Sequence, residues 1–316
     1  MLTALVLTAG LGTRLDPLTR LVAKAAVPLA GQTLIERSLM RLAHQGVTDA
    51  VLNLHHLPAS ITGVVGDGAR FGMRVRYSWE SPILGSAGGP RRALSLIDAD
   101  RFLIVNGDTL CDIDLAAMIH DHEASGADVT MSVVPNPAPD HYNGIRIDDD
   151  RWVTSFAPRG QANGTWHFIG VQVVEARVFA DLSDGVPEET VSGIYRHRIA
   201  AGDGRIRCHC LDLPFVDVGT PRDYLDAALS LAGAQGLGNA IEAGADVSPA
   251  ARLSRCVVWS DAAVGARAIL DDCVVAGVRI PDGFRTHGAV LVPAGTVRAG
   301  DSAPVAHGIA AFPLKR

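Results

Sequence analysis

Apolar positions in the first half of the chain follow two different spacings. Short apolar runs, which predict buried strands, occupy residues 4–9, 49–54, 101–108 and 128–134. Segments whose apolar positions recur with the period of a helix lie between them, at residues 34–46, 58–65 and 114–126. Strands that alternate with helices in this way predict an α/β domain with a doubly wound, mostly parallel sheet.

The ends of these strands are the expected position of a ligand site. In open parallel sheets, ligands bind beyond the carboxyl ends of the strands. Residues 8–14, 53–56 and 106–109 stand at the ends of three predicted strands. We therefore expect these three segments to lie on one rim of the sheet.

The pattern changes after residue 141. Residues 142–174 contain shorter strand-like runs between polar turns, which predict an inserted or flanking sheet region that covers the site. Gly- and Ala-rich residues 233–244 predict a linker, and aliphatic residues then recur at steps of five or six, as in the coils of a β-helix. The predicted domains are 1–232 and 245–316, the second a short left-handed β-helix.

Composition and charge narrow the possible partners. With 48% hydrophobic and 20% charged residues, the chain is predicted to be globular. A net charge of −6 and the lack of any Lys/Arg run argue against a nucleic-acid partner. No apolar run is long enough to span a bilayer, so no membrane partner is expected. Five scattered cysteines predict no disulfide scaffold and favour a reducing, cytoplasmic location.

The first predicted strand runs into a glycine loop, residues 8–15. Glycines after a buried strand let backbone N–H groups approach phosphate oxygens, and a following basic side chain can clamp them. A dinucleotide fingerprint would need a third glycine where Leu15 stands, and a Walker loop would need Gly-Lys-Ser/Thr. Taken alone, the loop is equally well explained as a tight turn between strand and helix.

Two aspartates end apolar runs in similar contexts. Asp108 closes the run 101–108, and Asp217 precedes a Gly turn and a predicted helix. Mg²⁺ is usually held by one or two carboxylates together with substrate phosphates and water. Each aspartate read singly is also explained as a helix cap or turn residue.

The glycine loop and the residues that follow it resemble the signature of sugar-1-phosphate nucleotidylyltransferases. Residues 10–19, GLGTRLDPLT, match G-x-G-T-R-L-x-P-L-T, and Lys24 and the turn at 28–31 match the P-K-P and P-x-x-G elements that follow. Alanines replace both prolines beside Lys24, which removes loop stiffness but keeps the charge. Only Lys24 and Lys315 are lysines among 28 basic residues, which marks Lys24 as a position that needs a compact ammonium.

This resemblance implies a Rossmann-like sheet of the nucleotide-diphospho-sugar transferase type, with residues 1–232 as the catalytic domain. It also implies catalytic roles for Arg14, Lys24 and Asp108, and Mg²⁺ held by Asp108 and Asp217, whose D-V-G-T-P segment is similar to the family's own. The residues that it assigns to the nucleotide are Ala9, Gly10, Gly12, Thr13, Arg14, Glu80, Gly85, Ala87 and Gly88. Glu80 heads a segment similar to E-x-x-x-L-G-T-A-G-G, and its carboxylate could accept from guanine; it could equally face solvent.

The resemblance is looser for the residues that would contact the sugar. Asn143 and Gly144 resemble the glycine turn that touches the sugar, and Gly170 lies in a stretch similar to the family's A-G-I-G strand. Arg159 stands near the family's E-K-P lysine and could take over its charge, or be an ordinary surface arginine. Residues 51–57 look like a segment of both mannose-1-phosphate guanylyltransferases and N-acetylmuramate-1-phosphate uridylyltransferases and do not separate the two.

The resemblance implies transfer of a nucleotidyl group from a nucleoside triphosphate to a sugar 1-phosphate, with release of pyrophosphate, and Glu80 favours GTP with mannose 1-phosphate. The alternatives are uridylyl or thymidylyl transfer to another sugar 1-phosphate, and a non-catalytic subunit that binds a nucleotide-sugar. The C-terminal region is too short for a full acyl-CoA site. A structural role there, or the assembly of a homo-oligomer, is expected instead.

Overall fold

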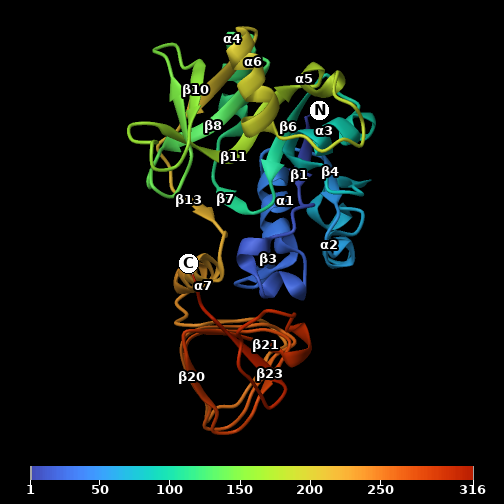
Figure 1. Cartoon of the computed structure of the whole chain (residues 1–316). Coiled ribbons are helices and arrows are strands. Elements are labelled where there is room, and N and C mark those ends of the chain that lie inside the picture. The colour runs from blue at the N-terminus through green and yellow to red at the C-terminus, as the bar shows by residue number, and fades with distance from the viewer. Residues whose placement is uncertain (1, 316) are drawn as a thin grey trace. The chain divides into compact units, whose positions relative to one another are not determined.

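The computed structural model describes residues 2–315 (Figure 1). By their contacts the residues form two compact units. The first comprises residues 1–10, 38–58 and 65–216, and the second comprises residues 11–37, 59–64 and 217–316. Residues 11–31, the signature loop, are therefore grouped with the C-terminal region, whereas Gly10 belongs to the first unit. This grouping cuts across the predicted boundary at residue 232, and the domain limits stay a prediction.

A nine-stranded sheet forms the centre of the first unit. Its main path has the order β10-β9-β11-β6-β1-β4-β5, and β8 and β12 pair beside β11. The strands are β1 (Thr3–Leu7), β4 (Asp49–Leu54), β5 (Arg74–Trp79), β6 (Arg101–Asn106), β8 (Val129–Pro135), β9 (Gly144–Ile147), β10 (Val153–Ala157), β11 (Trp166–Glu175) and β12 (Ile206–Cys210). Four strands, β6-β1-β4-β5, are parallel neighbours, as expected.

Several strands outside the parallel part of the sheet pair antiparallel. β11 runs antiparallel to β6 and β8, and β9 pairs antiparallel with β10. Residues 142–174 contain β9, β10 and β11, which extend the central sheet beyond its parallel part. Short runs divided by polar turns predict strands correctly, but they do not reveal to which sheet the strands belong.

Helices complete the first unit: α3 (Gly85–Ile97), α4 (Leu115–Ser125), α5 (Arg177–Ala180) and α6 (Tyr195–Ala201), while α1 (Leu34–His44) and α2 (Pro58–Val65) cross the division between the units. α3 packs against β1, β4 and β5, and α4 packs against β8, β11 and β12. The hydrophobic core that α3, α5 and α6 share with the sheet contains fully buried aromatic side chains, among them Phe102, Phe179 and Tyr195. Among the described residues, no helix is both long and apolar enough to cross a membrane.

The second unit contains the signature loop, α7 (Pro221–Gly233) and a stack of parallel strands. Successive strands pair at steps of 16 or 17 residues, such as Arg252 with Ile269 and Ile269 with Arg285. The parallel strands are β14 (Ala240–Ile241), β15 (Asp246–Val247), β16 (Arg252–Val258), β17 (Ala263–Val264), β18 (Ile269–Val275), β19 (Arg279–Ile280), β20 (Arg285–His287) and β21 (Ala289–Pro293). Two further strands, β22 (Val305–Ala306) and β23 (Ile309–Pro313), pair antiparallel with each other, and β23 pairs antiparallel with β21. Such registers fit stacked coils, and the left-handed sense of the predicted β-helix stays a prediction.

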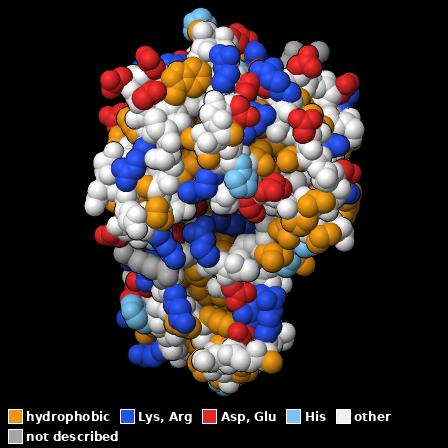
Figure 2. All heavy atoms as spheres, turned by 45° about the horizontal axis from the view of Figure 1, so that its top comes forward, with side chains coloured by type: hydrophobic (Ala, Val, Ile, Leu, Met, Phe, Trp, Pro, Cys, Tyr) orange, Lys and Arg blue, Asp and Glu red, His pale blue; other side chains and the backbone are white. Residues whose placement is uncertain are grey.

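Residues 240–241 of the predicted linker already form β14, which pairs with β16. On the face drawn in Figure 2, Lys and Arg side chains are interspersed with Asp and Glu side chains and with apolar ones.

A buried histidine on α4 gives the first unit a predicted pH dependence. The His122 ring is 1% exposed, with Nδ1 2.8 Å from the Thr130 hydroxyl and Nε2 3.1 Å from the Glu175 carboxylate. Burial lowers the pKa of His122 below its ordinary 6.5, and the neighbouring Glu175 only partly offsets this effect. Near and below pH 6.5 this histidine binds more protons in the unfolded chain than in the folded one. The free energy of unfolding therefore falls as the pH drops.

We expect His122→Gln to flatten the decline in unfolding free energy between about pH 7 and pH 5, because the substitution removes the titrating ring. Denaturant unfolding at a series of pH values measures this decline. His120, exposed on the same helix, provides the matched control, His120→Gln. An unchanged pH slope in the His122 variant would show that this ring does not govern acid sensitivity.

Candidate functional site

In the first unit, three strand ends meet on one rim as the sequence predicts. Leu7, the last residue of β1, pairs with Asn53 of β4 on one side and with Asn106 of β6 on the other. Ala9 is buried directly after β1, and Gly10 is exposed. This register confirms the predicted rim for the part of the loop that belongs to the first unit.

Asp108 stands on this rim because Gly107 allows two strands to approach closely. The Gly107 N–H donates to the Leu7 carbonyl at 3.1 Å, and a Cβ at this position would lie 2.8 Å from the same oxygen. A larger residue would push β6 away from β1. The backbone bond of Gly107 therefore holds the segment that carries Asp108 beside the end of β1, where the glycine loop begins.

Asn53 organises the start of the loop, a role that the sequence does not reveal. Its side-chain oxygen accepts from the Thr8 N–H at 2.6 Å and from the Ala9 N–H at 3.3 Å. Its amide nitrogen donates to Glu80 at 2.7 Å. Asn53 was part of a matched segment, but nothing in the segment indicated that its side chain fixes the residues after β1.

The Glu80 side chain is buried, so the alternative of a solvent-facing carboxylate is wrong. The side chain is 3% exposed, and its two carboxylate oxygens accept from Asn53 and from the Leu84 N–H at 2.8 Å. Contact with a guanine base stays a prediction, and this geometry counts against it because both oxygens already have partners in a buried setting. Through these two hydrogen bonds, Glu80 connects the end of β4 to the turn before α3.

Replacing Glu80 with glutamine is expected to lower the unfolding free energy by about 1–3 kcal/mol, because glutamine offers one acceptor where two donors converge. Chemical denaturation measures the loss. Glu123→Gln is the matched control: Glu123 is 54% exposed in a surface ion pair with Arg101, so its loss should cost less than about 1 kcal/mol. Equal losses in the two variants would contradict the role given to Glu80.

The glycine-rich start of α3 is closely packed against residues 186–190. The Ala87 N–H donates to the Glu188 carbonyl at 2.9 Å, and the Gly88 N–H donates to the same carbonyl at 3.2 Å. A Cβ on Gly85 or Gly88 would lie 2.6 Å from backbone oxygens of this segment. Close packing against this segment therefore explains why these residues are small. Their contact with the nucleotide stays a prediction.

The residues predicted for the sugar lie along the antiparallel part of the sheet. Gly170 has a positive φ of 84° in a bulged part of β11, where a Cβ would lie 2.9 Å from the Asn106 side chain. Asn143 and Arg159 are joined, because the Arg159 N–H donates to the Asn143 side-chain oxygen at 3.0 Å. Gly144 is buried against Thr165 and Ala162.

An aromatic row beside Asn143 was not found by sequence reasoning. The rings of Tyr142 and His167 lie 4.2 Å apart between centroids, and His167 lies 5.3 Å from Phe215. Burial lowers the pKa of His167, which favours a neutral ring near neutral pH. The three residues are far apart in the sequence, so no spacing rule could have grouped them.

In the second unit, two parts of the signature lie together. Gly12 has a positive φ of 62°, and a Cβ on it would lie 2.7 Å from Thr19 and 3.0 Å from the Cβ of Lys24. Thr19 donates its hydroxyl to the Gly12 carbonyl at 3.1 Å. The loop is thus folded back on itself, with the half-buried Lys24 next to Gly12 and the exposed Thr13 one residue further.

Arg14 meets the second aspartate segment. A Cβ on Gly219 would lie 2.9 Å from Nη1 of Arg14, so the guanidinium rests against the backbone two residues after Asp217. The segment is fixed by a capping box at the start of α7, in which Thr220 and Asp223 exchange side-chain to backbone hydrogen bonds. Arg14 and the D-V-G-T-P segment, more than 200 residues apart, are thereby brought together.

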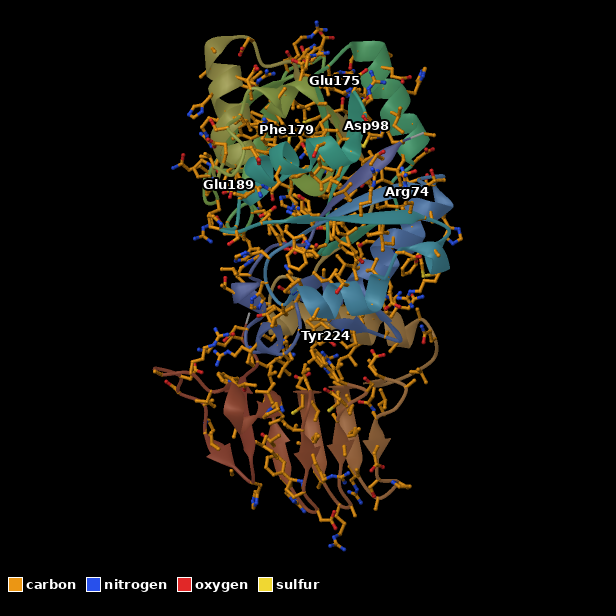
Figure 3. The ribbon with its side chains drawn as sticks, turned by 90° about the vertical axis from the view of Figure 1, so that its right-hand side faces the viewer. Arg74, Asp98, Glu175, Phe179, Glu189 and Tyr224 are labelled. Carbon is orange, nitrogen blue, oxygen red and sulfur yellow. The ribbon has the colours of Figure 1, made fainter. Side chains whose placement is uncertain are left out.

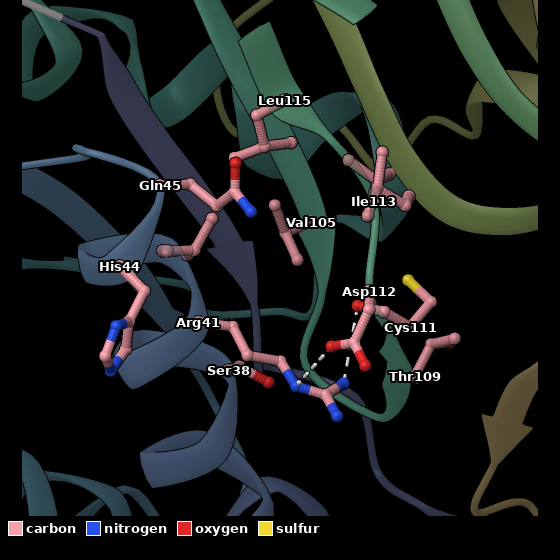
Figure 4. Close-up of a pocket in the computed structure, with 12 residues that line it drawn as sticks. Ser38, Arg41, His44, Gln45, Val105, Thr109, Cys111, Asp112, Ile113 and Leu115 are labelled. Atoms are coloured by element: carbon pink, nitrogen blue, oxygen red, sulfur yellow. Dashed lines mark hydrogen bonds and ion pairs between the residues drawn. The ribbon is translucent and has the colours of Figure 1, made fainter. Parts of the chain in front are cut away.

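A pocket of about 250 Å³ lies elsewhere in the first unit, between α1, β6 and β7 (Thr109–Cys111) (Figure 4). Its wall is mainly apolar, and Arg41 is ion-paired with Asp112 at 3.3 Å. Burial raises the pKa of the Cys111 thiol to about 11, so the thiol is protonated and unreactive near neutral pH. The described residues that line the pocket include none of the predicted site residues.

Comparisons with known proteins agree with the signature. A family model described as nucleotidyl transferase matches residues 3–233. A mannose-1-phosphate guanylyltransferase of Mycobacterium tuberculosis is 30% identical over 94% of this chain and 81% of its own length. An N-acetylmuramate alpha-1-phosphate uridylyltransferase of Neisseria meningitidis is 32% identical over 58% of this chain and 79% of its own.

Among solved structures, HddC of Yersinia pseudotuberculosis in complex with GMP-PN is similar. It superposes with a TM-score of 0.63 at 24% identity, covering 73% of this chain and all of that one. At this identity the likeness bears on the fold, which is mixed α/β around a sheet with a parallel core.

Proposed function

The chain belongs to the nucleotidyl transferase family, and on this premise we propose that it transfers a nucleotidyl group from a nucleoside triphosphate to a sugar 1-phosphate. One observation carries the proposal beyond family membership. Each compact unit brings part of the signature next to one of the two aspartates: Ala9 and Gly10 lie on the rim with Asp108, and Arg14 rests on the Asp217 segment.

The reaction that fits these residues needs no side-chain nucleophile. A phosphate oxygen of the sugar 1-phosphate attacks the α-phosphorus, a P–O bond forms, and the bond to the bridging oxygen of the β-phosphate breaks. Pyrophosphate leaves with the electron pair of that bond. The protein's contribution is alignment and charge neutralisation, for which the Arg14 guanidinium and the Lys24 ammonium are the proposed cations.

The two aspartates suit a divalent cation by the chemistry of their oxygens. Mg²⁺ prefers carboxylate oxygens and commonly takes only one or two from a protein, leaving its other positions to substrate phosphates and water. Among the described residues, no group of three or more His, Cys, Asp or Glu side chains could hold a metal by itself. Asp108 and Asp217 would hold Mg²⁺, which supplies charge neutralisation at the phosphates when bound.

GTP and mannose 1-phosphate are the proposed substrates. The support comes from the mannose-1-phosphate guanylyltransferase of M. tuberculosis, because its similarity extends over nearly the whole chain, including the C-terminal region. Glu80 gives little support for guanine, because its carboxylate oxygens already accept hydrogen bonds from Asn53 and Leu84. Assembly of a homo-oligomer through the C-terminal region stays a prediction.

A grid of nucleoside triphosphates against sugar 1-phosphates, with Mg²⁺ and a pyrophosphate assay, tests this proposal. We expect the highest kcat/KM for GTP with mannose 1-phosphate. If pyrophosphate is released instead with UTP or dTTP and another sugar 1-phosphate, the proposed substrates are wrong but the proposed reaction class is right. Absence of release from every pair would favour a subunit that binds a nucleotide-sugar without making it.

A further inference from the structure

The signature loop is tied to the C-terminal region at two points within the second unit. Residues 11–37 form one compact unit with residues 217–316. Sequence reasoning gave the C-terminal region a structural or oligomerising role and no link to the loop. The contacts between the two segments are polar, partly buried and specific.

The first point of attachment is Arg20, one residue after the G-x-G-T-R-L-x-P-L-T match. Its side chain is 7% exposed and lies between two carboxylates, Asp16 of the loop and Asp301 near the C-terminus. Nε donates to Asp16 at 2.6 Å, Nη1 donates to the Thr296 carbonyl at 2.8 Å, and Nη2 donates to Asp301 at 3.2 Å. The guanidinium also lies 5.0 Å from the centre of the Phe312 ring.

Asp301 is itself held in place for this pairing. The Arg298 N–H donates to its carboxylate at 2.7 Å. Its contact with Arg20 lowers the pKa of Asp301 to about 2, so the carboxylate is charged at any ordinary pH. The donors of a guanidinium form a rigid, planar fork. Arg20 therefore fixes both the distance between itself and the two carboxylates and the direction in which they approach.

The second point of attachment is the turn at residues 28–31. The Gly31 N–H donates to both oxygens of Glu242, at 3.0 and 3.2 Å, and Glu242 is 8% exposed. Tyr224 on α7 donates its hydroxyl to the Pro28 carbonyl at 2.5 Å and accepts from Nε1 of Trp259 at 2.8 Å. Figure 3 places Tyr224 on α7, beside the strands of the stack.

The two attachments bracket Lys24 and lie close in sequence to Arg14, the two proposed cations. Arg14 precedes Arg20, the first attachment, by six residues, and Lys24 lies between Arg20 and Gly31. The two alanines beside Lys24 leave this stretch without the prolines that stiffen the family's signature. External contacts at both ends can supply the restraint that proline would otherwise give.

We infer that Asp301 and Glu242 are positioning residues, through which the C-terminal region holds the loop so that Arg14 and Lys24 meet the triphosphate. The catalytic consequence rests on the proposed function. The restraint on the loop does not, and it can be measured on the full-length chain without any substrate.

The test compares Asp301→Asn with Asp246→Asn, a matched loss of charge on a side chain that is 76% exposed in the same unit. Hydrogen–deuterium exchange is followed in peptides that cover residues 11–31. We expect exchange in Asp301→Asn to rise by about tenfold or more, and the control to stay at the wild-type rate. We also expect a KM for the triphosphate raised by about 10-fold or more, with the KM for the sugar 1-phosphate unchanged.

Asp301→Glu, which keeps the charge, should recover most of both effects. Should Asp301→Asn fail to fold, judged by circular dichroism, Glu242→Gln takes its place with the same readouts. Wild-type exchange in the loop of a folded variant overturns the inference, and so does raised exchange with an unchanged KM for the triphosphate. If the wild-type chain turns over no substrate pair, the proposed function fails, while the exchange measurement still decides whether the C-terminal region restrains the loop.

Discussion

Substituting alanine for Arg14 is expected to lower kcat/KM for the nucleoside triphosphate by about 100- to 1000-fold, the range observed when one preorganised charge-stabilising donor is removed. The Arg14 side chain is exposed, and its guanidinium rests against Gly219. The melting temperature should therefore stay within about 3 °C of the wild type, as for most surface substitutions.

Arg279→Ala is the matched control for this loss, because Arg279 belongs to the same unit and its side chain is 77% exposed. Arg14→Lys should recover part of the activity, since a lysine keeps the charge but not the two parallel donors of the guanidinium. Wild-type kcat/KM in Arg14→Ala would remove this residue from the mechanism.

Asp108→Asn is expected to reduce kcat by about 100-fold or more and to raise the Mg²⁺ concentration needed for half-maximal turnover. Asparagine keeps the shape and one oxygen, but it removes the negative charge that a divalent cation requires. Initial rates measured over a Mg²⁺ titration give both quantities. Asp217→Asn should behave in the same way.

Asp112→Asn is the control for the loss of charge, because Asp112 lies four residues further along and its side chain is 86% exposed. It should keep wild-type kinetics. A normal Mg²⁺ dependence in Asp108→Asn would show that Asp108 is a turn residue and no metal ligand, which is the simpler explanation that a strand-end aspartate always admits.

The parallel centre of the sheet could be predicted because its information is local. Each buried strand is a continuous apolar run, each helix repeats its apolar positions, and the rim follows from where the strands end. The register of Leu7 with Asn53 and Asn106 confirms that inference. The assignment of β9 and β10 to the same sheet depends on pairing with β11, which apolar spacing does not encode.

Contacts between distant residues account for what sequence reasoning missed. Glu80 was interpreted from its neighbours, but its partner Asn53 lies 27 residues earlier, and the two meet because β4 and β5 are paired. Arg20 and Asp301 are 281 residues apart. A charged residue in a loop is usually solvated, so neither residue stood out until the fold placed them together.

The most direct test of nucleotidyl transfer follows the phosphorus atoms themselves. ³¹P NMR of the protein with Mg²⁺ and the best substrate pair from the grid should show pyrophosphate and the coupled signals of a nucleotide-sugar diphosphate growing in equal amounts. The signals of the triphosphate and the sugar 1-phosphate should decline together. Orthophosphate as the only product, or spectra that do not change with any pair, would contradict the proposed reaction.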